Sequence, residues 1–232
     1  MSELIQISDL SKSYGKKEAL SNLSLTIESG KVIGLLGPNG SGKTTLIKIL
    51  CGLLTPTNGH VTIDGKEIGP ETKAIVSYLP ERTYIPNWMK VKDILDYFED
   101  FYKDFRRSVA EDMLSRLRID PSAKLKTLSK GNKEKVQLIL VMSRNAKLYL
   151  LDEPIAGVDP AARDYILDTI VTNYNPDASI IISTHLIQDI ERILDDVIMI
   201  QYGHLKVFGS ADALRSEKGM SIDELFREVF RC

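Results

Sequence analysis

Gly37-Pro38-Asn39-Gly40-Ser41-Gly42-Lys43-Thr44 is the stretch of sequence that decides the fold. An uninterrupted apolar run at 32–36 precedes it, and apolar residues at helical spacing follow it from Thr44 onward. A glycine-rich segment between a buried strand and a helix lets successive backbone N–H groups turn toward phosphate oxygens, at the positive end of the helix. The pattern G-x-x-x-x-G-K-[ST] in this setting predicts a phosphate-binding loop rather than an ordinary turn.

The side chains of this loop have predicted roles of their own. Lys43 is expected to reach the β- and γ-phosphates, and the Thr44 hydroxyl is expected to coordinate Mg²⁺. No third glycine follows Gly40 and Gly42 at dinucleotide spacing, so the loop does not match a dinucleotide-binding fingerprint.

A second candidate site feature is the acidic pair Asp152-Glu153, which follows the apolar run 148–151. Ligands of open α/β sheets bind beyond the carboxyl ends of the strands, where this pair would lie. Asp152 is expected to hold Mg²⁺ directly or through water, and Glu153 to orient or deprotonate the attacking water. An acidic pair at a strand end is often a solvated turn, but the phosphate loop upstream favours the functional interpretation.

The chain alternates between strand and helix patterns, which predicts an α/β fold with a mainly parallel sheet. Apolar residues at 4–7 and 23–27 indicate early strands, and Asp64-Gly65 indicates a hairpin over 61–68. Further strands are expected at 148–151, 180–182 and 197–200. Helices are expected from Thr44, with Leu46, Ile49, Leu50 and Leu53 on one face, and at 91–117, 132–144, 160–173, 186–194 and 221–231.

The composition excludes several classes of protein. The 232 residues are 43% hydrophobic and 27% charged, which excludes wholesale disorder. Thirty Lys and Arg against 32 Asp and Glu give a net charge of −2, so no basic field predicts binding to nucleic acid. Two cysteines, Cys51 and Cys232, make no disulfide framework, which favours a reducing compartment. With no secretory signal and no membrane-length apolar run, the expected location is cytoplasmic.

The motifs together resemble the ATP-binding subunit of an ATP-binding cassette (ABC) transporter, over essentially the whole chain as one domain. Besides the loop and the acidic strand, the resemblance rests on Leu128-Ser129-Lys130-Gly131-Asn132, Ala156-Gly157-Val158-Asp159-Pro160 and Ser183-Thr184-His185, in the order of the family. It implies a P-loop core, an N-terminal antiparallel β part and a helical subdomain at about 82–146. It also implies ATP and Mg²⁺ as cofactors.

The resemblance assigns roles residue by residue. Ser129 and Gly131 match signature residues that reach ATP bound by the opposite subunit, Asp159 matches a dimer contact, and His185 matches a histidine that touches the γ-phosphate. The residues that it implies in ATP binding are Tyr14, which stacks on adenine, Gly37, Asn39, Gly40, Ser41, Gly42, Lys43, Thr44 and Thr45. Thr44, Asp152 and the residue after Tyr78-Leu79-Pro80 would hold the metal.

Two positions depart from the commonest pattern of the family. Glu81 stands where a glutamine is usual, and an ionised carboxylate binds Mg²⁺ but donates no hydrogen bond. Lys130 and Asn132 stand where Gly and Gln are commonest in the signature. These changes bear on the rate of hydrolysis and its coupling to transport more than on ATP binding.

Residues 84–105 hold seven of the sixteen aromatic residues. They form either a groove for a cytoplasmic helix of a membrane partner, with Trp88 as its anchor, or the core of the small subdomain. Three functions stay open at this point. The first is a transport ATPase of exporter type, held by a separate permease at the inner face of the membrane. The others are a soluble ABC ATPase acting on DNA or the ribosome, and a weakly hydrolysing regulatory cassette.

Overall fold

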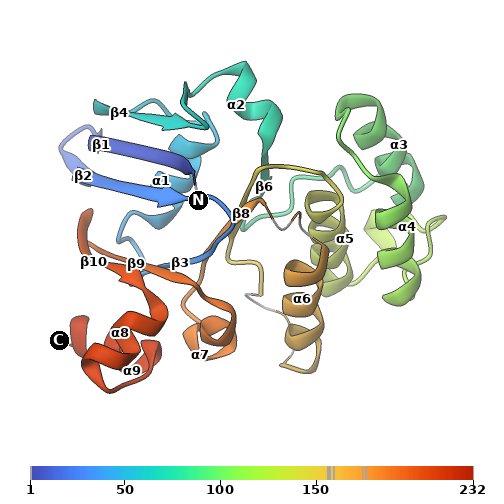
Figure 1. Cartoon of the computed structure of the whole chain (residues 1–232). Helices are drawn as coiled ribbons and strands as arrows, with labels where there is room; N and C mark the ends of the chain where they lie inside the picture. The colour runs from blue at the N-terminus through green and yellow to red at the C-terminus, as the bar shows by residue number, and fades with distance from the viewer. Residues whose placement is uncertain (1, 156–157, 159, 174, 176, 232) are drawn as a thin grey trace.

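The N-terminal part of the chain is an antiparallel sheet (Figure 1). The computed structural model describes residues 2–155, 158, 160–173, 175 and 177–231. The strands of this sheet lie in the order β2-β1-β4-β5. They are β1 (Glu3–Tyr14), β2 (Lys17–Glu28), β4 (Asn58–Ile63) and β5 (Lys66–Glu67). The last two form the hairpin expected at Asp64-Gly65.

The second sheet is six-stranded and mainly parallel, in the order β10-β9-β3-β8-β7-β6. Its strands are β3 (Val32–Leu36), β6 (Val76–Leu79), β7 (Leu148–Asp152), β8 (Ser179–Ser183), β9 (Asp196–Gln201) and β10 (His204–Ser210). Among the described strands of this second sheet, β9 and β10 at its edge are the only neighbours that pair antiparallel. The predicted fold class, an α/β fold with an N-terminal antiparallel part, is therefore confirmed.

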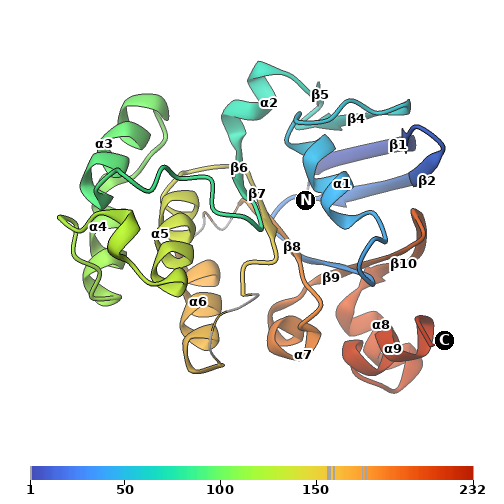
Figure 2. The same ribbon diagram turned by 180° about the vertical axis from the view of Figure 1, so that it is seen from behind.

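Helices connect the strands and cover the parallel sheet (Figures 1 and 2). The α-helices are α1 (Lys43–Leu50), α2 (Pro70–Ile75), α3 (Val91–Phe101), α4 (Arg107–Arg116), α5 (Lys130–Met142), α6 (Pro160–Asn173), α7 (Ile187–Ile190), α8 (Ala211–Lys218) and α9 (Ile222–Val229). Two 3₁₀ turns, η1 (Leu125–Thr127) and η2 (Glu191–Ile193), complete the connections. No helix in the part of the chain that the structure describes is both long and apolar enough to span a bilayer.

The middle residues of β3, β7 and β8 are apolar because both faces of these strands are buried, whereas polar residues such as Asp152 and Ser183 lie at the strand ends. In β3, Ile33 and Leu35 pack with α1 and the antiparallel sheet, whereas Val32 and Leu36 pack on the side of α5 and α6. The same alternation continues in β7 and β8. The loops at the carboxyl ends of these strands are thus held by a sheet that is packed on both sides.

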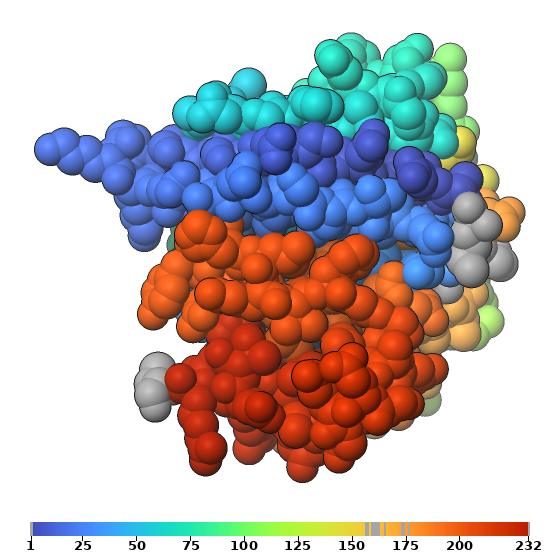
Figure 3. Space-filling view, turned by 60° about the vertical axis from the view of Figure 1, so that its left-hand side comes forward, coloured from blue at the N-terminus to red at the C-terminus, as the bar shows by residue number. Residues whose placement is uncertain are grey.

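Figure 3 shows the antiparallel strands from a third direction. The strands β1 and β2, in blue, lie between the region of β4, in cyan, and the C-terminal part, in orange to red. The end of the β1–β2 hairpin, where Tyr14 pairs with Lys17, projects beyond the body of the molecule.

Two expectations about the elements are wrong in detail, and two α-helices and two strands, β6 among them, were missed. Leu53 is not on the buried face of α1, because the helix ends at Leu50, and its side chain is 58% exposed. The helix expected at 91–117 is divided into α3 and α4, because the backbone of 104–106 pairs with 143–145. The elements α2, β6, β10 and α8 were not expected at all.

Candidate nucleotide-binding site

The phosphate loop joins β3 to α1, as the sequence predicts. Gly42 has a φ of 114°, and a Cβ atom there would lie 2.5 Å from the Ala19 carbonyl oxygen, so only glycine fits. Pro38, Asn39 and Gly40 are exposed at the tip of the loop, and Thr45 follows in the first turn of α1. The loop therefore presents its backbone and the amino end of α1 to solvent, as an anion site requires.

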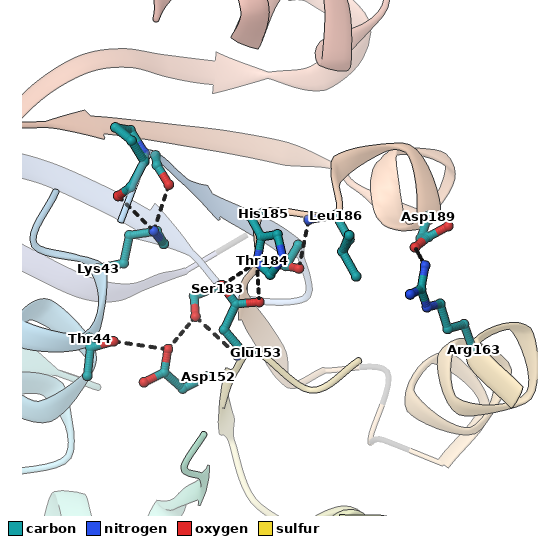
Figure 4. Close-up of polar contacts among 12 residues, drawn as sticks. Lys43, Thr44, Asp152, Glu153, Arg163, Ser183, Thr184, His185, Leu186 and Asp189 are labelled. Carbon is teal, nitrogen blue, oxygen red and sulfur yellow. Dashed lines mark hydrogen bonds and ion pairs between the residues drawn. The ribbon is translucent and has the colours of Figure 1, made fainter. Parts of the chain in front are cut away.

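Lys43 is the buried cation of this loop. Its side-chain Nζ donates hydrogen bonds to the carbonyl oxygens of Gly37 at 2.6 Å and Pro38 at 3.2 Å (Figure 4). Burial lowers the pKa of Lys43, and the carboxylates of Glu153 and Asp152 act in the opposite direction. An ammonium group held by neutral carbonyls alone gains a stronger, charged partner when a phosphate oxygen replaces them.

Asp152 ends β7 and is 2% exposed. Its Oδ1 accepts hydrogen bonds from the hydroxyls of Ser183, at 2.5 Å, and Thr44, at 3.3 Å. Its Oδ2 is buried and has no hydrogen-bond partner within the described residues. A buried carboxylate oxygen without a partner, beside a threonine hydroxyl, is the donor set that a hard cation such as Mg²⁺ prefers. Thr44 and Asp152 thus fit the predicted metal.

Glu153 turns the chain out of the sheet directly after Asp152. Its φ of 54° is in the left-handed region, which costs a non-glycine residue roughly 1–3 kcal/mol. Its backbone N–H donates to the Ser183 carbonyl oxygen at 2.9 Å, which holds this turn. Both carboxylate oxygens lie 3.1 Å from Nδ1 of His185, so the predicted water-activating acid and the predicted histidine are in contact (Figure 4).

Ser183 is a site residue that the sequence reasoning missed. It had no assigned role, yet its hydroxyl donates to Asp152, and it lies opposite Asp152 in the parallel register of β7 and β8. Since both residues end neighbouring strands, the strand order would have been the signal that places them together.

Glu81 and Tyr14 lie outside this cluster. Glu81 is exposed in the loop after β6, and among the described residues no hydrogen bond connects it to Thr44 or Asp152. Tyr14 ends β1 with 48% of its surface exposed, and Nζ of Lys12 lies 5.5 Å from the centre of its ring. An exposed ring face at a hairpin end is free to stack on a base.

The signature residues lie at the start of α5, on the helical side of the molecule (Figure 1). The Ser129 hydroxyl accepts a hydrogen bond from the Asn132 backbone N–H at 3.3 Å and so caps α5. An added Cβ at Gly131 would meet nothing within 4 Å. This helix end is therefore accessible to a second molecule. Asp159, the predicted dimer contact, lies outside the described residues.

A groove of about 1290 Å³ lies between the α2–β6 segment and α3. The aromatic stretch contributes both to the core and to the surface, because Phe98 is 8% exposed and packs in the core, whereas Trp88 is 72% exposed. Tyr97 and Phe101, stacked with their ring centres 6.0 Å apart, are also exposed in this aromatic groove. Four exposed aromatics in one concave surface, Tyr84 included, indicate a binding surface for an apolar segment.

Arg144 forms part of the groove wall and is 3% exposed. Its guanidinium donates to both carboxylate oxygens of Asp104, at 3.1 and 3.0 Å, and to the carbonyl oxygens of Ala74 and Val76. It also lies 4.0 Å from the centre of the Tyr102 ring. One side chain thus joins the two sides of the groove, α2–β6 and the loop after α3.

The phosphate loop, the acidic strand end and the histidine define a nucleoside triphosphate-binding protein of the P-loop class. A family model described as ABC transporter matches residues 20–156. An uncharacterized ABC transporter ATP-binding protein of Methanocaldococcus jannaschii is 33% identical over 217 residues, which cover 91% of this chain and 79% of that protein. The chain belongs to the ABC transporter family, as one of its ATP-binding proteins.

Two further comparisons extend over nearly the whole chain. Nod factor export ATP-binding protein I of a Rhizobium species is 29% identical over 231 residues, covering 96% of this chain and 76% of that protein. A solved structure described as the ATP binding subunit of an ABC transporter has a TM-score of 0.88 at 29% identity, covering 98% of this chain and 100% of that one.

Proposed function

We propose that this chain hydrolyses ATP as half of a dimer of ABC ATPase subunits and thereby drives a separate, multi-spanning membrane permease of exporter type. The observation that carries the proposal is the cluster at the ends of β3, β7 and β8, where Lys43, Asp152 and Glu153 meet in a member of this family. The relative named as an export protein supports the direction of transport.

The site residues divide the hydrolytic work among them. Lys43 exchanges its carbonyl partners for β- and γ-phosphate oxygens. Glu153 orients the attacking water and accepts its proton, while His185, held by that carboxylate through Nδ1, keeps its other ring nitrogen for the γ-phosphate. The Glu153 carboxylate and the His185 imidazole are in contact at 3.1 Å, so the proposed base and the proposed phosphate ligand act as one unit.

The metal belongs to the same proposal. When bound, Mg²⁺ neutralises phosphate charge as it develops. Thr44 and Asp152 would hold it, since their oxygens are adjacent and Oδ2 of Asp152 is without a partner among the described residues. Glu81, in the loop after β6, would join them on closure of the site.

The second subunit completes each site. Ser129 and Gly131 lie at the exposed amino end of α5, and α5 and α1 belong to different parts of the molecule in Figures 1 and 2. A helix amino end of this kind stabilises a phosphate, so we infer that it serves the ATP of the opposite subunit, with Asp159 in the contact between subunits. The dimer contains either two copies of this chain or this chain and a related one.

The aromatic groove is the proposed contact with the permease. A short amphipathic helix would place its apolar face against Trp88, Tyr97 and Phe101. Exposed Lys73 and Lys103 lie among the residues that line the groove and favour an acidic residue on that helix. This contact would hold the chain at the cytoplasmic face of the membrane.

The direct test is Glu153→Gln. The amide cannot accept the proton of water, so we expect hydrolysis to fall at least about a hundredfold. ATP should then accumulate a dimer that is visible by size-exclusion chromatography with light scattering. The matched control is Glu217→Gln, on an exposed carboxylate of α8, which should hydrolyse ATP like the parent. Equal turnover by the parent and Glu153→Gln would show that another group is the base.

A pull-down from membranes in mild detergent, with tagged Glu153→Gln chain and ATP, tests the partner. We expect a multi-spanning membrane protein, and its loss when Trp88→Ala is added to the same bait. Recovery of ribosomes or DNA without a membrane protein would instead favour the soluble ABC ATPase. A chain that dimerises with ATP but hydrolyses almost none would favour the regulatory cassette.

A further inference from the structure

Arg163, in the first turn of α6, connects two segments that follow the site strands (Figure 4). Its Nε donates a hydrogen bond to the carbonyl oxygen of Val158 at 3.1 Å. Its Nη1 donates to Oδ2 of Asp189 at 2.8 Å, and the two side chains of this ion pair are only 24% and 34% exposed. The planar guanidinium therefore holds a backbone carbonyl and a carboxylate at the same time.

These two partners are close in sequence to the catalytic pair. Val158 lies five residues after Glu153 and directly before Asp159, and Asp189 lies four residues after His185. Because β7 and β8 are neighbours, Arg163 bridges the segments that continue from their carboxyl ends. A displacement of either segment by more than a few tenths of an ångström breaks one of the two hydrogen bonds.

Asp189 is joined tightly to the end of β8. The Asp189 N–H donates to the Leu186 carbonyl oxygen at 3.3 Å, and the Leu186 N–H donates to the Thr184 hydroxyl at 3.0 Å. Thr184 is fully buried. His185 therefore lies within a short hydrogen-bonded turn, and the position of Asp189 sets the direction in which that turn leaves the sheet.

A second ion pair joins the same elements and serves as an internal comparison. Arg192 of η2 contacts Asp164 of α6 at 2.9 Å, but these side chains are 57% and 75% exposed. This pair connects helix to helix, and among the residues that the structure describes it makes no hydrogen bond to Val158. Like Arg163, the Arg192–Asp164 pair joins α6 to the segment after His185, but unlike Arg163 it is not bonded to Val158.

We propose that Arg163 is a positioning residue that makes the backbone at Val158, directly before the predicted dimer contact Asp159, and the turn carrying His185 move together. The inference rests on the proposed function, in which Asp159 contacts the second subunit and His185 contacts the γ-phosphate. Closure of the dimer on the Asp159 segment then acts through Val158, Arg163 and Asp189 on the histidine. Hydrolysis becomes dependent on the presence of the second subunit.

The test compares Asp189→Asn and Arg163→Lys with Asp164→Asn. The first removes the charge of the carboxylate, and the second keeps the cation but loses the fork that reaches both partners. We expect both to lower kcat about tenfold, within the usual range of coupling between sites. The KM for ATP and the affinity for a fluorescent ATP analogue should change less than twofold. Asp164→Asn should match the parent in all three, and Asp189→Glu should recover most of the loss in kcat.

Two further measurements, the melting temperature of each variant and the amount of ATP-induced dimer, distinguish a positioning role of Arg163 from a merely structural one. In the Glu153→Gln background, Asp189→Asn should reduce the ATP-induced dimer, whereas Asp164→Asn should not. Equal losses of kcat in Asp189→Asn and Asp164→Asn, or a loss that follows the melting temperature, would overturn the proposal. A parent chain that binds ATP but forms no dimer and hydrolyses none would overturn the proposed function itself, which is a different result.

Discussion

The nucleotide site and the aromatic groove are built in different ways. The site collects polar groups at the carboxyl ends of β3, β7 and β8, where each makes a hydrogen bond to another group of the protein. The groove exposes aromatic rings on α3 and on the segment before it, and its buried cation, Arg144, makes hydrogen bonds that hold its walls. The first surface is prepared to bind charge, and the second is prepared to bind an apolar segment.

Under the proposed function, the nucleotide site performs the chemistry and the groove transmits it to the permease. A single side-chain change in the site should remove activity and leave the fold intact. A change in the groove wall should affect the fold, since its contacts are structural. Helix α5 connects the groove to the end that we assign to the ATP of the opposite subunit, with Arg144 just beyond its carboxyl end and Ser129 at its amino end.

The largest expected effect is a loss of ATP hydrolysis, and it should occur when one lysine, Lys43, is replaced but not when another, Lys73, is replaced. Lys43→Met removes the cation that faces the phosphates, so we expect kcat/KM for ATP to fall about a thousandfold. Lys73→Met, in the groove, should stay within twofold of the parent. Steady-state ATP hydrolysis by the purified chain measures both. A similar loss in Lys73→Met would mean that the groove belongs to the catalytic machinery and that the two regions are not distinct.

A smaller effect is expected on stability. Arg144→Met leaves Asp104 and the carbonyl oxygens of Ala74 and Val76 without their donor, which should lower the free energy of unfolding by about 3 kcal/mol. Urea denaturation followed by circular dichroism measures this change. The control is Arg107→Met, whose three carboxylate partners are all more than half exposed, and it should cost under about 1 kcal/mol. Equal losses of unfolding free energy in Arg144→Met and Arg107→Met would show that the contacts of Arg144 in the groove wall stabilise the fold no more than an exposed ion pair does.

The smallest effect concerns Glu134, near the signature end of α5. Burial raises the pKa of its carboxyl above the ordinary value of 4.5, and Lys130 acts weakly in the opposite direction. The folded state therefore keeps the proton more readily than the unfolded state, and stability falls as the pH rises from the unfolded pKa through the folded one. Glu134→Gln should remove this loss and stabilise the chain at pH 7 by less than about 1 kcal/mol. A Glu134→Gln chain that is less stable than the parent at pH 7 would contradict the raised pKa of Glu134.

The core of the site could be predicted because its signals are local. The apolar run before Gly37, the glycine spacing and the acids after 148–151 each lie within one short segment, so the strand–loop–helix order follows directly. The aromatic groove could be suspected but not decided. The rings of α3 are exposed or buried according to contacts with α5 and β6, which lie far away in the sequence.

The remaining misses have the same cause. Ser183 joins Asp152 only through the register of two strands that are 31 residues apart. The helical pattern at 91–117 is interrupted because 104–106 finds backbone partners at 143–145, and those hydrogen bonds outweigh local helix propensity. Leu53 fits the periodicity of α1, but Gly52, at a φ of 65°, has already left the helix.

The strand order of the parallel sheet also bears on how the chain is made. β3 carries the phosphate loop, and both of its neighbours, β8 and β9, come from the last third of the sequence. At roughly 5–20 residues per second, a ribosome adds β9 about ten to thirty seconds after β3. The antiparallel sheet can form early on the emerging chain, whereas the loop has no finished sheet to hold it until β9 appears. A ribosome-bound chain that stops before β9 should therefore capture no ATP, and nucleotide binding would mark the completion of synthesis.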